Sequence, residues 1–534
     1  MGRYLLLISS TLLALTLRGV SAQTEPASGC VQPATQAHAS NFTTIFDDPA
    51  VQNKSIQLLA QAVQFPTMSF DGMGVPGVDP RWAPFDDFHA FLEASFPNLY
   101  SKANVTAINT YSLVFTLNGS NPDLMPMMIT GHQDVVPATT SLDRWTFPPF
   151  SGTVDDTWIY GRGSGDCKNT VIGSMIAVEH LLEQGWTPTR TLLLAFGQDE
   201  EIGGHMGATN VNLHLLSLYG EDGVAMIVDE GGSGVDSSQF GRTFALPGVV
   251  EKGSVNIMVE VDMMGGHSSI PTDKTSIGVL SEIAETFENS HVFQPHLEEA
   301  HPVWSYLQCA TQFGDPAQIP AWISQDVNVT SNPNLQDAAN NFANISISNR
   351  YLIQTSKAAT IFNAGVKSNE LPESANGTFN VRIEIFSNVT AVQDAFLTFV
   401  HPVAEKYSLT VNGTSFSDQP SIGNITVIWG NPHDPTPKSP FDANSTAWRV
   451  ISELNQAIWG DVITAPSAMT GNTDTRNYLS LTKNIYRWSP IRVGERVGMH
   501  TVDERISIRA YLEGLKFYTE LIVRVDNVTT DDGL

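Results

Sequence analysis

Cysteine is scarce in this 534-residue chain. The three cysteines, Cys30, Cys167 and Cys309, are too few for a disulfide framework that would hold a fold together. One bridge, between Cys30 and Cys309, is allowed but not demanded, because Cys167 falls within a candidate site described below.

Basic residues are also few. The chain has 28 Lys and Arg against 55 Asp and Glu, which gives a formal net charge of -27 and a sequence pI near 4.7. A nucleic-acid partner would require a basic surface, so this balance argues against one. The charge suits a soluble protein in an acidic or extracellular medium.

Long apolar runs are missing beyond the first residues. Arg3, the apolar stretch 4–17 and the small residues Val20-Ser21-Ala22 form a signal peptide pattern, so we expect residues 1–22 to be removed and Gln23 to begin the mature chain. The run is short for a membrane span, although a signal anchor remains the alternative. No other stretch is long enough, so we expect no stable membrane span.

Asn-x-Ser/Thr sequons are dense. Twelve of them lie between Asn41 and Asn527, behind the signal peptide. This combination predicts a glycoprotein of the secretory pathway, either secreted or delivered to a vacuole, because a signal peptide specifies entry and not exit.

The length and the patterning predict two domains of α/β class. Apolar and aromatic fractions of 42% and 9% are ordinary for a globular protein. Strand and helix patterns alternate as far as Asp229, as in a mostly parallel sheet flanked by helices. Residues 111–117 meet Asn118-Gly119, which predicts a hairpin whose returning strand is 125–131.

The character of the chain changes near Glu251-Lys252-Gly253. Val255, Ile257, Val259 and Val261 alternate strictly with polar residues, and a helix pattern follows over 276–289. Segments 358–364, 378–385, 392–407 and 408–411 then have strand, strand, helix and strand patterns. We therefore expect a βαββαβ unit at 252–430, inserted between catalytic segments 23–251 and 431–534, with 431–440 as the return linker.

Polar side chains follow three of the expected strands. Met125–Gly131 runs into His132, Thr191–Phe196 into the pair Glu200 and Glu201, and Val224–Val228 into Asp229. The carboxyl ends of parallel strands share one edge of a sheet, where ligands collect. Adjacent glutamates repel each other unless a positive charge lies nearby. The pattern therefore predicts a metal site.

Each of these residues also has a simpler interpretation. His132 alone could be a structural histidine, and Asp134 could orient it. Asp166, in GRGSGDCKN, precedes a helix pattern and could be its N-cap. The glycines around it fit neither a P-loop nor a dinucleotide fingerprint well.

Seven motifs in order resemble those of the M20 family of dinuclear zinc peptidases. They are GHQDVVP, GRGSGDCKN, DEEIGG, VDEGG, GGHSS, GNTDTR and MHTVDER, and the similarity runs from about Asn41 to Val523. The branch with the greatest similarity contains carboxypeptidase S and Gly-Xaa carboxypeptidases, together with secreted N-acyl-amino-acid hydrolases.

The resemblance implies two Zn²⁺ ions per subunit and a role for each site residue. Asp166 would bridge the two ions, with His132 and Asp229 completing one site and Glu201 and His500 the other. Glu200 would be the general base for a water shared by the metals, and Asp134 would steer His132. The peptide bond between Asp166 and Cys167 would be cis.

The resemblance also gives the inserted unit a function as lid and dimerisation module, which allows a homodimer. His267 would stabilise the oxyanion, although a turn histidine after two glycines is the simpler interpretation. Asn369 and Arg382 would bind the substrate carboxylate, with Arg476 as a second anchor. Glu504 would support the ligands without being one. The segment 291–350 is longer than expected for a simple lid domain.

These expectations describe a secreted zinc metallocarboxypeptidase. It would cleave the C-terminal amide bond of short peptides of the Gly-Xaa type. One alternative is an aminoacylase acting on N-acyl amino acids with a free carboxylate. The other is a metal-free, non-catalytic binding protein, which a missing ligand or base would indicate.

Overall fold

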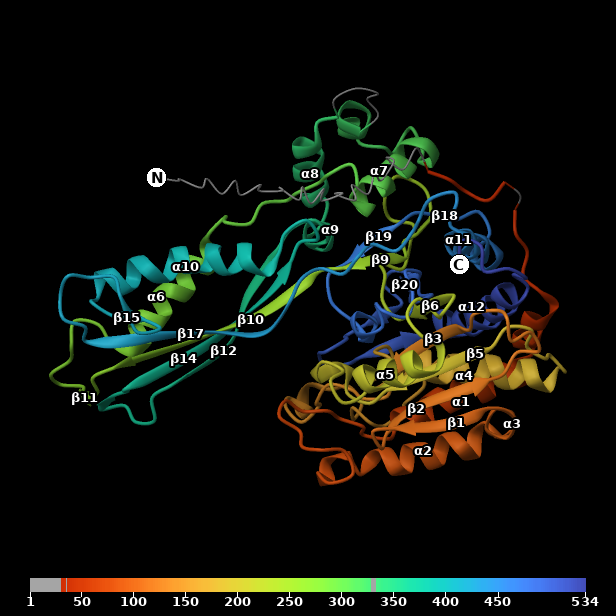
Figure 1. Cartoon of the computed structure of the whole chain (residues 1–534), viewed down its shortest axis with the longest axis horizontal. Helices are drawn as coiled ribbons and strands as arrows, with labels where there is room; N and C mark the ends of the chain where they lie inside the picture. The colour runs from red at the N-terminus through yellow and green to blue at the C-terminus, as the bar shows by residue number, and fades with distance from the viewer. Residues whose placement is uncertain (1–29, 35, 328–332) are drawn as a thin grey trace, which may run out of the picture.

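The computed structural model describes residues 30–34, 36–327 and 333–534 (Figure 1). The expected signal peptide, 1–22, lies outside these residues. In the described part of the chain, no helix is long and apolar enough to cross a membrane.

The larger sheet has eight strands in the order β1-β2-β5-β3-β6-β20-β9-β19. The pairs β5–β3, β3–β6, β6–β20 and β9–β19 are parallel and the other three pairs are antiparallel. The expected mostly parallel α/β sheet is therefore confirmed. The strands are β1 (Asn104–Ile108), β2 (Ser112–Leu117), β3 (Met127–His132), β5 (Leu192–Gly197), β6 (Met226–Asp229), β9 (Gly248–Glu251), β19 (Ser467–Met469) and β20 (Ile485–Arg487).

Helices cover both faces of this sheet (Figure 1). One face packs against α1 (Pro49–Val63), α4 (Lys168–Glu183), α11 (Thr446–Trp459) and α12 (Ile508–Asp526), and the other face packs against α5 (Ala208–Tyr219). Helix α4 is followed by Gly185, which has φ +80 and whose N–H donates to the oxygen of Leu182.

The expected hairpin between residues 111–117 and 125–131 is wrong. Strand β2 lies between β1 and β5, whereas β3 lies between β5 and β6. Gly119 is needed for close packing rather than for a turn, because a Cβ there would lie 2.3 Å from the carbonyl oxygen of Thr189.

A second sheet extends away from the first (Figure 1). Its order is β12-β14-β10-β17-β15-β16, and α6 (Ser276–Asn289) and α10 (Val389–Lys406) pack against it around a separate apolar core. We call this body the inserted unit. Its strands are β10 (Gly253–Met263), β12 (Ser356–Ala364), β14 (Ser374–Ile383), β15 (Thr410–Val411), β16 (Thr414–Ser415) and β17 (Gly423–His433).

The fourth long strand of this unit is not the one that the sequence indicated. The expected strand 408–411 is reduced to two residues in β15, and β17 pairs with β10 instead. Its end, Asn431 to His433, had been assigned to the return linker. The register between β10 and β17 shifts there, and Asn431 has φ +46, so a bulge accommodates Asn431 and Pro432 within a strand.

Residues 291–327 and 333–353 belong to neither of these two sheets. They contain α7 (Pro302–Phe313), a π-helix (Ile323–Val327), α8 (Leu335–Ala343) and α9 (Ile347–Leu352), which we call the helical insertion. Its core side chains Tyr306, Leu307 and Phe342 cluster with Phe244 and Ile463 from beside the catalytic sheet. The Cys30–Cys309 disulfide, which the sequence allowed, joins α7 to the start of the described chain.

The described part of the chain has further elements. They are α2 (Pro84–Ser95), α3 (Pro97–Lys102), β4 (Trp158–Tyr160), β7 (Val235–Asp236), β8 (Phe244–Ala245), β11 (Gly266–His267), β13 (Glu370–Leu371), β18 (Ile463–Thr464), β21 (Arg496–Val497) and β22 (Arg505–Ser507), with 3-10 turns at Asn41–Asp47, Pro80–Trp82, Leu142–Arg144, Glu200–Ile202 and Asp474–Asn477.

Candidate metal centre

Three adjacent strands deliver acidic and imidazole side chains to one edge of the larger sheet. His132 is the last residue of β3, Glu200 and Glu201 form a 3-10 turn after β5, and Glu230 follows β6. These strands are mutually parallel, so their carboxyl ends coincide. These side chains therefore lie at the same edge of the sheet.

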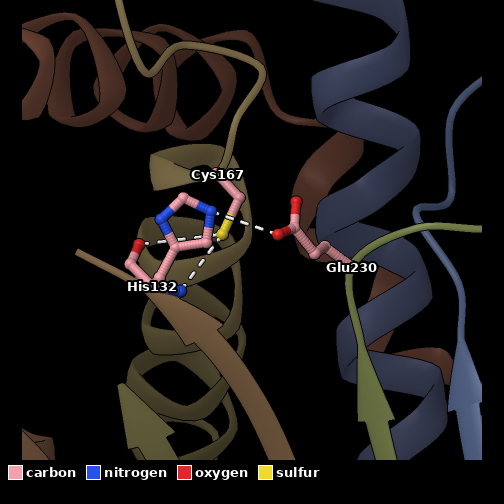
Figure 2. Close-up of side chains that lie close together, drawn as sticks. All are labelled: His132, Cys167 and Glu230. Carbon is pink, nitrogen blue, oxygen red and sulfur yellow. Dashed lines mark hydrogen bonds and ion pairs between the residues drawn. The ribbon is translucent and has the colours of Figure 1, made fainter. Parts of the chain in front are cut away.

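His132 lies at the centre of the first group of side chains. Its Nε2 is 3.2 Å from Asp166 Oδ1 and 3.1 Å from Glu230 Oε1. Figure 2 shows Glu230 pointing toward the imidazole, with Cys167 alongside. The Cys167 sulfur accepts the backbone N–H of His132 at 3.1 Å and is fully buried. The peptide bond between Asp166 and Cys167 is cis, as the resemblance implied.

His500 organises the second group. Its Nε2 lies 3.1 Å from Asp166 Oδ2 and 3.1 Å from Glu201 Oε2. Asp166 therefore presents one carboxylate oxygen to each histidine. That arrangement suits a carboxylate shared between two cations.

Asp134 holds the surrounding backbone in place. Its Oδ1 accepts the N–H of Glu200 at 3.0 Å and its Oδ2 accepts the N–H of Glu201 at 3.1 Å and the hydroxyl of Ser69 at 2.6 Å. The Nδ1 of His132 is 2.9 Å from the backbone oxygen of Asp134 and 3.4 Å from Oδ1. Asp134 thus orients both His132 and the glutamate pair.

The structure brings Glu230 to His132, whereas Asp229 was the expected partner. In the described chain, ligand atoms within 4.8 Å of one another come from His132, Cys167 and Glu230 and from His132, Asp166 and Glu201. Asp229 belongs to neither group, and its Oδ1 accepts the N–H of Glu230 at 2.8 Å. Successive side chains at a strand end point in opposite directions, so only one of these two acids faces the histidine.

The electrostatics of the site favour a bound cation. Burial raises the pKa of Glu201 to about 7 and that of Asp229 to about 7, and burial also holds the pKa of Glu200 well above its usual value. Hydrogen bonds to Asp166 and Glu201 raise the pKa of His500 to about 10. Crowded, desolvated carboxylates are stabilised by a divalent cation.

The donor set also fits zinc. Glu201 Oε1 is buried without a hydrogen-bond partner among the described residues, which leaves it available as a ligand. Histidine nitrogens and carboxylate oxygens are the ligands that zinc takes in catalytic sites. These residues therefore fit the metals that the sequence implied.

Glu504 supports the loop that carries Asp166, as expected. Its Oε1 accepts the N–H groups of Gly163, Gly165 and Asp166 at 3.0 to 3.2 Å, and its other oxygen pairs with Arg162. The side chain of Glu504 is fully buried. It therefore fixes the position of the shared carboxylate without facing the histidines.

Glu504→Gln is expected to weaken metal binding by roughly 10- to 100-fold, the range for residues that orient ligands. The amide offers one acceptor where the carboxylate offers two, so Arg162 loses its ionic partner. Metal affinity can be measured by competition with a chelator. Glu513→Gln, which removes the partially exposed ion pair with Arg492, is the matched control and should retain wild-type affinity. If Glu504→Gln and Glu513→Gln bound metal with equal affinity, Glu504 would not be positioning the metal ligands.

The expected substrate-binding residues divide into two groups. Arg382 on β14 donates to Asn472 Oδ1 at 2.6 Å, and Arg476 donates to the oxygen of Gly203, two residues beyond Glu201. These two arginines therefore lie beside the glutamates. His267 and Asn369 are exposed near β11 and β13, at the far end of the inserted unit, so the structure does not bring them to the metal centre of the same chain (Figure 1).

Two acidic residues at the site were not predicted. Glu230 shares the VDEGG motif with Asp229, and Asp474 lies within GNTDTR. Burial, followed by the charge of Asp229, holds the pKa of Asp474 well above its usual value. The motifs indicated both regions, but spacing alone did not distinguish neighbouring acids.

Known proteins are similar to this chain over most of its length. The chain is 33% identical over 518 residues to carboxypeptidase S of Saccharomyces cerevisiae, covering 93% of this chain and 88% of that protein. It is 34% identical over 482 residues to the N-fatty-acyl-amino acid synthase/hydrolase PM20D1 of Homo sapiens, covering 88% of this chain and 87% of that protein.

Solved structures share the fold. Human carnosine dipeptidase 1 superimposes with a TM-score of 0.66 at 15% identity, covering 91% of this chain and 98% of that one. The di-peptidase Dug1p of Saccharomyces cerevisiae gives a TM-score of 0.66 at 13% identity, covering 92% of this chain and 99% of that one. The model of Peptidase family M20/M25/M40 matches residues 128–524. The chain therefore belongs to this peptidase family and is a hydrolase.

Proposed function

We propose that this protein is a metallocarboxypeptidase with two zinc ions, which hydrolyses the C-terminal amide bond of short peptides. The observation that carries the proposal is the position of Asp166, with one carboxylate oxygen 3.2 Å from His132 Nε2 and the other 3.1 Å from His500 Nε2. A carboxylate shared in this way is suited to two adjacent cations.

The ligand assignment follows the geometry. Asp166 would serve both ions, and His500 and Glu201 would complete one site. His132 and Glu230 would complete the other, so Glu230 replaces Asp229 in the set implied by the resemblance. The contacts that support this replacement are the 3.1 Å approach of Glu230 to His132 and the hydrogen bond of Asp229 to its own neighbour.

The protein residues supply proton transfer and orientation. Two zinc ions, when bound, would activate water and polarise the scissile carbonyl. Glu200 takes the proton of the attacking water and passes it to the leaving amine. Burial raises the pKa of Glu200, and Asp134 fixes its backbone, so the carboxylate is both basic and positioned.

The arginines beside the glutamates would bind the free carboxylate of the substrate. Arg382 and Arg476 approach the centre from the inserted unit and from the loop after β19, and Asn472 lies between them. Guanidinium groups match a carboxylate with paired hydrogen bonds. The leaving amino acid would therefore lie on this side of the metals.

Two further assignments belong to the same proposal. His267 and Asn369 would act at the metal centre of a second copy, since they lie far from their own, and this requires a homodimer through the inserted unit. Entry into the secretory pathway, with secretion or vacuolar delivery, rests on the N-terminal pattern and the sequons. A non-catalytic protein is disfavoured because none of the residues proposed as ligands or base is missing from the sequence.

Hydrolysis of N-acyl amino acids is the second candidate. It is supported by the similarity to PM20D1, whose name describes an N-fatty-acyl-amino acid synthase/hydrolase. Gly-Xaa preference is supported only by the resemblance of the motifs. Both reactions need the same metals, the same base and the same carboxylate anchor.

A blocked Gly-Leu dipeptide with a free carboxylate is expected to be cleaved, whereas its C-terminal amide is expected to be cleaved far more slowly. Arg382→Ala should lower kcat/KM for the free acid by roughly 10- to 150-fold, the range for a hydrogen bond to a charged group. Arg449→Ala on the exposed face of α11 is the control, and its kcat/KM for the free acid should equal that of the wild type. Equal cleavage of the acid and the amide would remove the carboxypeptidase assignment.

A further inference from the structure

A pocket lies between the helical insertion and the catalytic sheet. Its volume is about 560 Å³, within the range of roughly 300 to 1,000 Å³ found for small-molecule sites. One wall comes from α7, α8 and α9, and the opposite wall from Gly231–Gly234, β19 and residues 489–499. Neither the ligand sets nor the arginine anchor uses this space.

Several residues that line the pocket are neighbours of the proposed metal ligands. Gly231, which lines it, follows Glu230, and Met499, which also lines it, precedes His500. Arg496 lines the pocket as well and donates to the oxygen of Gly165, the neighbour of Asp166. A substrate held at Glu230 and His500 would therefore lie next to residues that line the pocket.

The pocket and the arginine anchor lie at opposite ends of one loop. Met469 and Thr470 line the pocket, and the same loop continues through Asn472, which contacts Arg382, to Arg476. Arg476 in turn contacts Gly203, on the Glu200 and Glu201 side of the site. If the substrate carboxylate lies at the arginines, the other half of the amide extends toward the pocket.

The lining is suited to an apolar chain. Tyr306, Phe342, Ile345 and Leu352 contribute from the helical insertion, and Leu246 and Ile491 from the catalytic side. The charged side chains of the lining have partners in the protein. Arg492 is paired with Glu513, Asp236 accepts hydrogen bonds from Ser238 and Gln239, and Arg496 donates to the oxygen of Gly165. Burial of an apolar chain in this pocket would increase its binding affinity by roughly fourfold for each methylene group.

The wall formed by the helical insertion is held firmly. Tyr306 and Phe342 belong to a core shared with Phe244 and Ile463, and the Cys30–Cys309 bond ties α7 to the chain outside the insertion. The pocket is therefore preformed, rather than dependent on movement of the inserted unit.

We propose that this pocket binds the acyl half of the scissile amide, and that the helical insertion selects substrates with an extended apolar acyl chain. The inference rests on the proposed function, because it takes the arginines as the carboxylate anchor. It adds a specificity site built by a segment that supplies no metal ligand and no base.

Ser348→Trp tests the pocket. Ser348 lines it from α9 and is exposed, so the indole can fill space without disturbing the core. Ile347→Trp is the matched control, since Ile347 is the next residue on α9, is 70% exposed and does not line the pocket. The substrates are N-acetyl-leucine and N-dodecanoyl-leucine, which share the leaving amino acid.

The expected result is a loss of more than about tenfold in kcat/KM for N-dodecanoyl-leucine in Ser348→Trp, with N-acetyl-leucine changed less than about twofold. Ile347→Trp should have the kcat/KM of the wild type for both substrates. The inference would be overturned if Ser348→Trp left the ratio of the two kcat/KM values unchanged, whether neither value fell or both fell equally.

A binding measurement separates this inference from the proposed function. In the Glu200→Gln background, the dissociation constant of N-dodecanoyl-leucine should rise more than about tenfold when Ser348→Trp is added. Failure of the proposed function would appear instead as no hydrolysis of any acyl or peptidyl substrate by the wild-type protein. An unchanged dissociation constant would overturn the pocket assignment whatever the turnover.

Discussion

Glu230→Ala is expected to leave about one metal ion per chain and to lower turnover by more than about 100-fold, beyond the effect typical of residues that only orient ligands. The reason is the 3.1 Å approach of Glu230 to His132 Nε2, which makes this carboxylate the second ligand beside His132. Removing it leaves one cation with His132 and the shared Asp166. Metal content and kcat should be measured on the same sample.

Asp229→Asn is the control for this prediction. Burial already raises the pKa of Asp229 to about 7, so a neutral amide of the same shape fits its surroundings. Asn can still accept the N–H of Glu230, and we expect this variant to keep both metals. The opposite pattern, with metal lost from Asp229→Asn and kept in Glu230→Ala, would restore the assignment made from the motifs.

Glu200→Gln is expected to keep both metals and lose roughly 10²- to 10⁴-fold in kcat, the range for removal of a general base. Glutamine preserves the shape of the side chain, and the N–H at position 200 can still donate to Asp134, so the fold should not change. The amide cannot accept the proton of the attacking water.

Glu221→Gln provides the matched change on the surface. Glu221 is exposed in the turn after α5, and its replacement should not affect turnover. Turnover by Glu200→Gln near that of the wild type, with both metals retained, would move the base to another residue. Loss of metal from Glu200→Gln would instead make Glu200 a ligand.

The sequence was most informative where backbone geometry restricts the side chains. Parallel strands end at one edge of a sheet, so the pattern predicts that His132 at the end of β3 and the glutamates after β5 lie together. Asp229 and Glu230 show the limit of that reasoning. Asp229 is the last residue of β6 and Glu230 is the next one, and only the direction in which each side chain leaves the backbone decides which carboxylate faces His132.

Long-range packing was less predictable. Asn118-Gly119 has the composition of a hairpin turn, but Gly119 is required by the backbone near Thr189, which is distant in sequence. Asn431 and Pro432 have the composition of a linker, but a bulge places them in β17. Helices α7 and α8 pack beside the catalytic sheet through apolar contacts and the Cys30–Cys309 bond. Both features join residues that are distant in sequence, so no local sequence pattern predicts them.

The most direct test of the two-metal site is a zinc titration of the full chain. The protein would be stripped with a chelator, and hydrolysis of a blocked Gly-Leu dipeptide would be followed as zinc is returned, with bound metal measured at each point. The site described here predicts no turnover in the stripped protein and a maximum at about two zinc ions per chain. Full turnover without metal, or a maximum at one ion, would contradict it.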